Sequence, residues 1–269
     1  MNDLFFGTDA QQSMLRRSRA LYDLLSADTR LTYYGRGVGI MDPSCDGALD
    51  LSERLVAIQG ASNFGHVATA DEPALAKSLE ARGYALTRYA KWEGGQSALD
   101  AAHSILNTFK MPADLTVHVL DEHSPDDHLA KLAQVSLACG VLPIAGSVLR
   151  GASKPGLGVV AVDATGAPVS CAAAASYTHP GSDLLPDQCW WGMLGTAPSH
   201  RGQKLALILG AIAIREGHRR FGFSNFMTGV VPGNSASEAV CTKTGLSVGS
   251  HGIITIVDAK TMGGGKLTS

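Results

Sequence analysis

Residues 201–206, Arg-Gly-Gln-Lys-Leu-Ala, combine the residue types that can hold a phosphate group. They follow residues 189–196, a charge-free apolar run that is typical of a buried strand. Pro198 ends this strand because proline cannot donate a backbone hydrogen bond. Residues 205–214 are helix formers, so the segment straddles the start of a helix.

The first N–H groups of a helix have no internal partner, and the aligned peptide dipoles place partial positive charge at that end. An anion such as a pyrophosphate binds there with few side chains. Arg201 and Lys204 add full charges, and Gly202 lets the backbone approach the ligand closely. The segment therefore predicts a pyrophosphate site, with an ordinary basic strand-to-helix turn as the alternative reading.

The remainder of the C-terminal half has a recognisable order. A strand-like run at residues 226–231 precedes Pro-Gly-Asn at 232–234, a short helical segment, Lys-Thr-Gly-Leu at 243–246 and a last strand through 253–257. This order, after the basic Arg-Gly turn and long helix, resembles the GNAT superfamily of N-acetyltransferases. The resemblance implies that acetyl-CoA is the co-substrate and that its acetyl group passes directly to an amine.

The resemblance also implies which residues contact acetyl-CoA. In the family, the end of the central strand pairs with the pantetheine arm, the basic turn holds the pyrophosphate, and the Asn before the short helix supports the arm. The corresponding residues are Met193, Leu194, Gly195, Thr196, Arg201, Gly202, Gln203, Lys204, Leu205, Ala206 and Asn234.

The same resemblance implies a backbone oxyanion donor on the central strand. A free N–H near Met193 and Leu194 would polarise the thioester carbonyl. Gly192 and Gly195 in this strand are consistent with a local distortion that frees such an N–H, although glycine can also mark tight packing.

Two positions depart from the family pattern. Lys204 stands where glycine is expected, so a left-handed backbone there would be strained. Cys241 stands where a Tyr commonly protonates the leaving thiolate. A thiol with an ordinary pKa of about 8.5 can donate a proton, but Cys is also among the most buried residue types. Cys241 is thus either the acid or a small buried hydrophobe.

The family often draws its general base from a Glu on the central strand, and this chain has none there. His179, just after the preceding strand, is the first candidate, because histidine titrates near neutral pH. Asp187 and His200 are weaker candidates, and each of the three is alternatively a solvated loop residue.

No metal site is expected. His118, His123 and His128 are spaced five apart rather than the four of one helix face, and they straddle a strand and a loop.

Composition excludes several classes of protein. A net charge of −2 with scattered basic residues argues against a nucleic-acid partner. The five cysteines are odd in number and form no Cys-x-x-Cys pair, which favours reduced thiols in the cytoplasm. No run approaches the roughly 18 apolar residues of a membrane span, so a soluble protein without a membrane partner is expected. Nothing in the sequence indicates the oligomeric state.

The chain is long enough for two domains of the α/β class. Residues 113–269 predict a GNAT-like domain with a mixed, mainly antiparallel sheet flanked by helices, and residues 96–112 a bridging helix. Residues 1–95 form an N-terminal α/β subdomain, in which residues 53–59 are expected to be a strand. This subdomain has no Arg-Gly turn, and it is either a truncated GNAT-like unit or an unrelated α+β cap.

The sequence thus predicts an acyl-CoA-dependent N-acyltransferase acting on a small-molecule amine, with the N-terminal half shaping the acceptor side. The adjacent Trp190 and Trp191 point to opposite faces of their strand, one into the core and the other toward the acceptor. The missing Glu, Cys241 and Lys204 motivate an alternative, a catalytically silent GNAT-fold protein that binds acyl-CoA. A third reading is an interaction module whose turn binds nothing.

Overall fold

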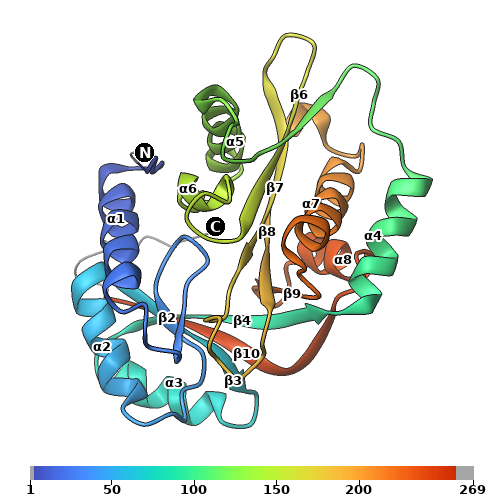
Figure 1. The fold of residues 1–269 in the computed structure, drawn as a ribbon. Coiled ribbons are helices and arrows are strands. Elements are labelled where there is room, and N and C mark those ends of the chain that lie inside the picture. The colour runs from blue at the N-terminus through green and yellow to red at the C-terminus, as the bar shows by residue number, and fades with distance from the viewer. Residues whose placement is uncertain (1–2, 259–269) are drawn as a thin grey trace.

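The computed structural model describes residues 3–258, and one continuous ten-stranded sheet runs through this part of the chain (Figure 1). Its strand order is β1-β2-β3-β10-β4-β9-β8-β7-β6-β5. Neighbours are antiparallel except for the pairs β2–β3 and β8–β9. The strands are β1 (Leu31–Thr32), β2 (Gly39–Ile40), β3 (Ala61–Ala68), β4 (Ala85–Gly94), β5 (Thr116–Val119), β6 (Gly156–Val162), β7 (Pro168–Ser176), β8 (Gln188–Thr196), β9 (Asn225–Val230) and β10 (Ser247–Val257).

Helices cover both faces of this sheet, as the predicted fold class requires. The helices are α1 (Asp9–Leu24), α2 (Ala48–Gln59), α3 (Glu72–Ala81), α4 (Gln96–Thr108), α5 (Asp126–Ala138), α6 (Gly146–Leu149), the 3₁₀ turn η1 (Pro198–His200), α7 (Leu205–Phe221) and α8 (Ser235–Lys243). Figure 1 shows α5 and α6 on the opposite side of β6 and β7 from α4 and α7. No helix among residues 3–258 combines the length and apolar character needed to cross a membrane.

Successive side chains of a strand point to opposite faces of the sheet, and the two largest hydrophobic cores lie on these two faces. On β7, Cys171, Ala173 and Ala175 belong to the core beneath α2, α5 and α6, while Ala172 and Ala174 belong to the core beneath α4 and α7. The mixed, mainly antiparallel sheet with flanking helices that the sequence predicted is therefore confirmed.

The expected strand at residues 53–59 is wrong, because these residues lie in helix α2. The buried positions Ser52, Leu55, Val56 and Gln59 are spaced three and four apart, which is the helical period. The short apolar run within them also fits a strand when it is judged from local pattern alone. Gly60, with φ +91°, ends the helix in a left-handed conformation.

The two halves of the chain share the sheet by exchanging strands. β10, from the C-terminal end, lies between β3 and β4 of the N-terminal half, and β4 in turn pairs with β9. Helix α4 lies where the sequence predicted a bridging helix. The exact division into 1–95, 96–112 and 113–269 stays a prediction, because the sheet crosses these boundaries without interruption.

Candidate functional site

Strands β8 and β9 separate partway along their length. Their parallel pairing extends over three residue pairs, the last of which joins Trp190 to Met227. Beyond this point β8 pairs with β7, with a register shift between Gly192 and Gly195. Met193, inside the shift, has φ +54°. This bulge confirms the local distortion that the two glycines indicated, and it leaves one edge of β8 without a neighbouring strand.

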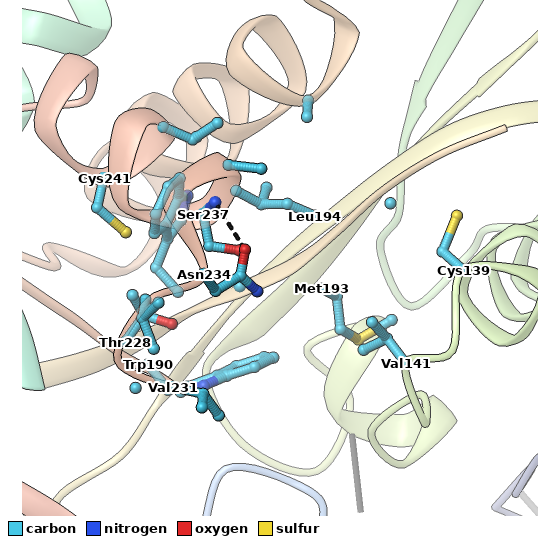
Figure 2. A pocket seen from close by; sticks show the side chains of 18 of the residues that line it. Cys139, Val141, Trp190, Met193, Leu194, Thr228, Val231, Asn234, Ser237 and Cys241 are labelled. Atoms are coloured by element: carbon cyan, nitrogen blue, oxygen red, sulfur yellow. Dashed lines mark hydrogen bonds between the residues drawn. The ribbon is translucent and has the colours of Figure 1, made fainter. Parts of the chain in front are cut away.

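A cavity of about 710 Å³ opens at this separation (Figure 2). It is lined by the end of β8, the turn before α7, the end of β9 and the start of α8. The sequence-predicted residues that line it are Met193, Leu194, Gly195, Thr196, Arg201, Gly202, Lys204, Leu205, Ala206, Asn234 and Cys241. Of the other residues that the sequence singled out, His200 lines the cavity, whereas Gln203, His179 and Asp187, all in the described part of the chain, do not.

The turn before α7 has the backbone geometry of an open helix start. After Pro198–His200, Gly202 adopts φ +83° and Lys204 adopts φ +61°. Helix α7 then begins at Leu205, and the side chain of its N-cap residue, Lys204, makes no capping hydrogen bond. Leu205 and Ala206 both line the cavity, so the positive end of the longest helix faces it. Lys204 does occupy the left-handed conformation that the sequence marked as strained.

The two basic side chains of this turn differ in their contacts. The Nε of Arg201 lies 3.5 Å from the carbonyl oxygen of Thr196, and the side chain is exposed. The ammonium nitrogen of Lys204 lies 3.9 Å from the centroid of the Phe109 ring. Arg201 is thus the guanidinium at the cavity mouth, whereas Lys204 is held by an aromatic contact.

Asn234 is fixed at the rim of the cavity by a helix cap. Its Oδ1 accepts a hydrogen bond of 3.2 Å from the backbone N–H of Ser237, drawn as a dashed line in Figure 2. Asn is among the preferred N-cap residues, so the sequence orients this side chain locally at the start of α8. The side-chain amide nitrogen remains available to a ligand in the cavity.

Cys241 lines the cavity but is only 2% exposed. Burial raises the pKa of its thiol to about 12, so the thiol stays protonated at neutral pH. A group with so high a pKa gives up its proton less readily than an ordinary thiol. The side chain packs in the core beneath α4 and α7, and this arrangement agrees with the alternative of a small buried hydrophobe.

His179 lies away from the cavity and is tied to the N-terminal half. Its Nε2 is 2.7 Å from the carbonyl oxygen of Ser26, and its Nδ1 accepts from the N–H of Gly181 at 2.9 Å. Both ring nitrogens are therefore engaged. Asp187 does not line the cavity either, whereas His200 does, with Nδ1 2.9 Å from the hydroxyl of Ser199. Among the described residues, no Asp or Glu lines the cavity.

The N-terminal half supplies a wall of the cavity that no local motif predicted. The ring of Tyr34 lies 4.6 Å from the Trp190 ring and 5.9 Å from the Tyr177 ring, centroid to centroid. Trp191 points to the opposite face, where its indole N–H donates to the carbonyl oxygen of Gly210 at 3.0 Å. The predicted opposition of the two tryptophans is confirmed, because Trp190 and Trp191 belong to the cores on opposite faces of the sheet. Both residues line the cavity, and the ring of Trp190 does so beside Tyr34.

Of the three histidines considered as metal ligands, His118, His123 and His128, only two lie in contact. The rings of His118 and His128 stack with centroids 3.9 Å apart. Within residues 3–258, no group of three or more His, Cys, Asp or Glu side chains is arranged to hold a metal ion.

Comparison with known proteins gives a clear result for the fold. No known family profile matches the chain, and a search of curated proteins found no match. Among solved structures, a GCN5-related N-acetyltransferase from Kribbella flavida has a TM-score of 0.57 at 16% identity, covering 91% of this chain and 95% of that one. A tandem GNAT protein from the clavulanic acid biosynthesis pathway has a TM-score of 0.53 at 13% identity, covering 82% of this chain and 74% of that one.

A third solved structure is similar over most of both chains. It is a GCN5-related N-acetyltransferase-like protein from Streptococcus suis, with a TM-score of 0.50 at 15% identity and coverage of 84% and 82%. The chain therefore has the GNAT fold that the order of its C-terminal elements implied, and the tandem neighbour supports a second GNAT-like unit, one of the two alternatives for the N-terminal half. At sequence identities this low, the structural similarity establishes the fold alone, and the activity depends on the residues of the site.

Proposed function

We propose that this protein is an acyl-CoA-dependent N-acyltransferase that uses acetyl-CoA and transfers the acyl group directly to an amine of a small molecule. The observation that carries the proposal is that the uncapped start of α7 and the unpaired edge of β8 open into one cavity. The helix start can bind a diphosphate, and the unpaired edge of β8 can pair with the amides of an extended arm. The two binding sites follow one another along the cavity. Bound acetyl-CoA would supply an acyl group activated as a thioester.

The residues of the chain take the following roles in this proposal. The N–H groups of Leu205 and Ala206, with the guanidinium of Arg201, hold the diphosphate. Residues 193–196 pair with the pantetheine arm as a neighbouring strand would, and Asn234 supports it. An N–H at the bulge near Met193 polarises the carbonyl, a contribution worth about 3 kcal/mol in comparable sites. Holding both substrates in one cavity contributes several kcal/mol more.

A second candidate function is a silent acyl-CoA-binding protein. The observation that favours it is the absence of any carboxylate among the described residues lining the cavity, together with the pKa of about 12 for the Cys241 thiol. Because no carboxylate of the described residues lines the cavity, the acceptor amine must lose its proton to solvent or to His200. The two functions share the binding site and differ only in turnover.

Calorimetric titration with acetyl-CoA and with CoA tests the shared site. Saturable heat with both ligands is expected, and no heat together with no thermal shift would reject both functions. Thiol release in the presence of a panel of small amines then separates them. Release above the hydrolysis background supports the acyltransferase, whereas binding without release for every amine selects the silent binder.

The charge reversal Arg201→Glu tests the diphosphate contact directly. We expect the affinity for acetyl-CoA to fall at least about tenfold, or about 1.4 kcal/mol, because an attractive contact becomes repulsive. The matched control is Arg17→Glu, which changes an exposed arginine on α1 outside the cavity. Wild-type affinity in Arg201→Glu would reject the proposed diphosphate site.

A further inference from the structure

A buried arginine, Arg36, lines the cavity, and no carboxylate in the described part of the chain pairs with it. Arg36 is 5% exposed, and its guanidinium carbon lies 5.6 Å from the ring centroid of Tyr34 and 5.7 Å from that of Trp190. One Nη donates to the carbonyl oxygen of Leu142, and the other lies 3.3 Å from the Tyr34 hydroxyl. The buried Nε–H finds no acceptor among the described residues. Within residues 3–258, no Asp or Glu oxygen lies within 4.0 Å of its nitrogens.

A buried charge of this kind is costly unless an opposite charge accompanies it. Arg150, which is 8% exposed, illustrates the usual solution, because its Nη2 lies 2.5 Å from Oδ1 of Asp126. Arg36 instead contacts a carbonyl, a phenol and two aromatic faces, none of which carries a full negative charge. The guanidinium therefore retains unused donors beside an accessible cavity.

The position of Arg36 separates it from the proposed diphosphate contacts. Its aromatic neighbour Trp190 lies six residues before Thr196 on β8, which corresponds to about 20 Å of extended strand. Arg201 and the start of α7 follow Thr196. The bulge at Met193 lies between the two ends. A ligand group bound at Arg36 is thus on the acceptor side of the proposed reaction centre.

We propose that Arg36 binds a carboxylate of the acceptor, so that the acceptors are amines that also carry a carboxylate, as amino acids do. This inference rests on the proposed acyltransferase function. A planar guanidinium matches the two oxygens of a carboxylate, and the paired hydrogen bonds are stronger than neutral ones. The rings of Tyr34, Trp190 and Tyr177 exclude water around the pair and so strengthen it.

The same charge disfavours other amines. A polyamine or any acceptor without an anion brings a positive charge toward a buried guanidinium and leaves that guanidinium unpaired. The specificity therefore comes from repulsion as well as from attraction, and a carboxamide in place of the carboxylate removes the attractive part.

The test uses matched pairs of amino acids and their carboxamides as acceptors. Thiol release is measured with acetyl-CoA for the wild type, Arg36→Gln, Arg36→Lys and the exposed control Arg17→Gln. We expect the wild type and the control to prefer the acids at least tenfold in kcat/KM. Arg36→Gln should use acids and amides nearly equally, and Arg36→Lys should keep part of the preference. Calorimetry with acetyl-CoA reports whether each variant is folded.

Two outcomes would overturn the inference: equal use of acids and amides by the wild type, or an unchanged preference in Arg36→Gln. If the wild type binds acetyl-CoA but releases no thiol, the acyltransferase proposal fails by itself. In that case we compare the thermal shifts that the acids and the carboxamides produce in the CoA-loaded protein. A larger shift with the acids supports carboxylate binding at Arg36, and equal shifts reject it. If Arg36→Gln loses acetyl-CoA binding, the kcat/KM for acids relative to that for amides is compared between the wild type and Arg36→Lys. A lower ratio in Arg36→Lys supports the role of Arg36, and an equal ratio rejects it.

Discussion

The ammonium nitrogen of Lys204 lies 3.9 Å from the centroid of the Phe109 ring, and this contact joins the start of α7 to the end of α4. A cation–π contact at a partly exposed site contributes about 0.5–1 kcal/mol. Lys204 has φ +61°, a conformation that costs a residue with a Cβ about 1 kcal/mol or more relative to glycine. The aromatic contact offsets part of this cost and explains how lysine is tolerated there.

Substitution of Lys204 separates the backbone from the side chain. Lys204→Gly removes the strain and the cation–π contact together, so we expect a free energy of unfolding within about 1 kcal/mol of wild type. Lys204→Ala loses the contact but keeps the strain, and it should be about 1 kcal/mol less stable than Lys204→Gly. Urea unfolding measures both. Equal stability of the two variants would contradict the strained backbone at this position.

Gly245 holds the end of α8 against the start of α4. Its φ is +77°, a Cβ there would lie 2.2 Å from the carbonyl oxygen of Ser97, and its own carbonyl accepts from the Ser97 hydroxyl at 2.7 Å. Gly233 has a similar φ of +88° but open space around it. We expect Gly233→Ala to cost about 1 kcal/mol and Gly245→Ala about 3 kcal/mol or more, because only the latter adds a backbone clash.

Chemical denaturation of the two glycine variants, side by side, checks this difference. Because α8 carries Asn234 and Cys241 along the cavity, a folded Gly245→Ala should also bind acetyl-CoA more weakly. A similar loss of stability in both variants would mean that the close contact with Ser97 relaxes at little cost.

His66 should make stability depend on pH below neutrality. Burial and the nearby Lys91 ammonium, 3.2 Å from Nδ1, lower the pKa of this histidine to about 4, while its ring stacks on His251 at 3.6 Å. The unfolded chain, with an ordinary pKa of about 6.5, binds the proton first. Stability is therefore full above about pH 6.5 and is lost as pH falls toward 4, by about 1–3 kcal/mol.

The measurement is urea unfolding at a series of pH values from 7 to 4 for the wild type and His66→Gln. The variant lacks the titrating group, so its stability should fall less steeply over this interval. His123→Gln, which changes a histidine whose side chain is 86% exposed, is the control and should follow the wild type. Identical slopes for His66→Gln and the wild type would contradict the prediction.

The cysteines at the cavity should differ in reactivity. Cys241 is buried and its pKa is raised to about 12, whereas Cys139 lines the same cavity and is only half-buried. The thiolate is the reactive form, so iodoacetamide at pH 8 should modify Cys139 at least tenfold faster than Cys241. Peptide mass spectrometry over a time course measures both rates. In urea the rates should become similar, and rapid labelling of native Cys241 would contradict its burial.

The local signals in this sequence were sufficient for the elements around the proposed diphosphate site. A charge-free strand ended by Pro198, a helix start after Arg201 and an N-cap at Asn234 are each decided by residues within a few positions of one another. Local pattern failed at residues 53–59, because an apolar run of that length satisfies both the helical and the strand period.

The lining of the cavity on the proposed acceptor side was decided by tertiary structure. Arg36 and Tyr34 come from a segment without periodic pattern, and they meet Trp190 across a tertiary contact. Thr32 bridges to Thr178, and the N–H of Tyr33 donates to the carbonyl oxygen of Tyr177, which joins this segment to the region between β7 and β8. His179, close in sequence to β8, is drawn instead to Ser26. The sequence by itself determined the helix start at which we propose that an anion binds, because helix ends are built from neighbouring residues. The set of side chains that line the cavity depended on contacts between distant parts of the chain. Such contacts produce no periodic pattern in the local sequence.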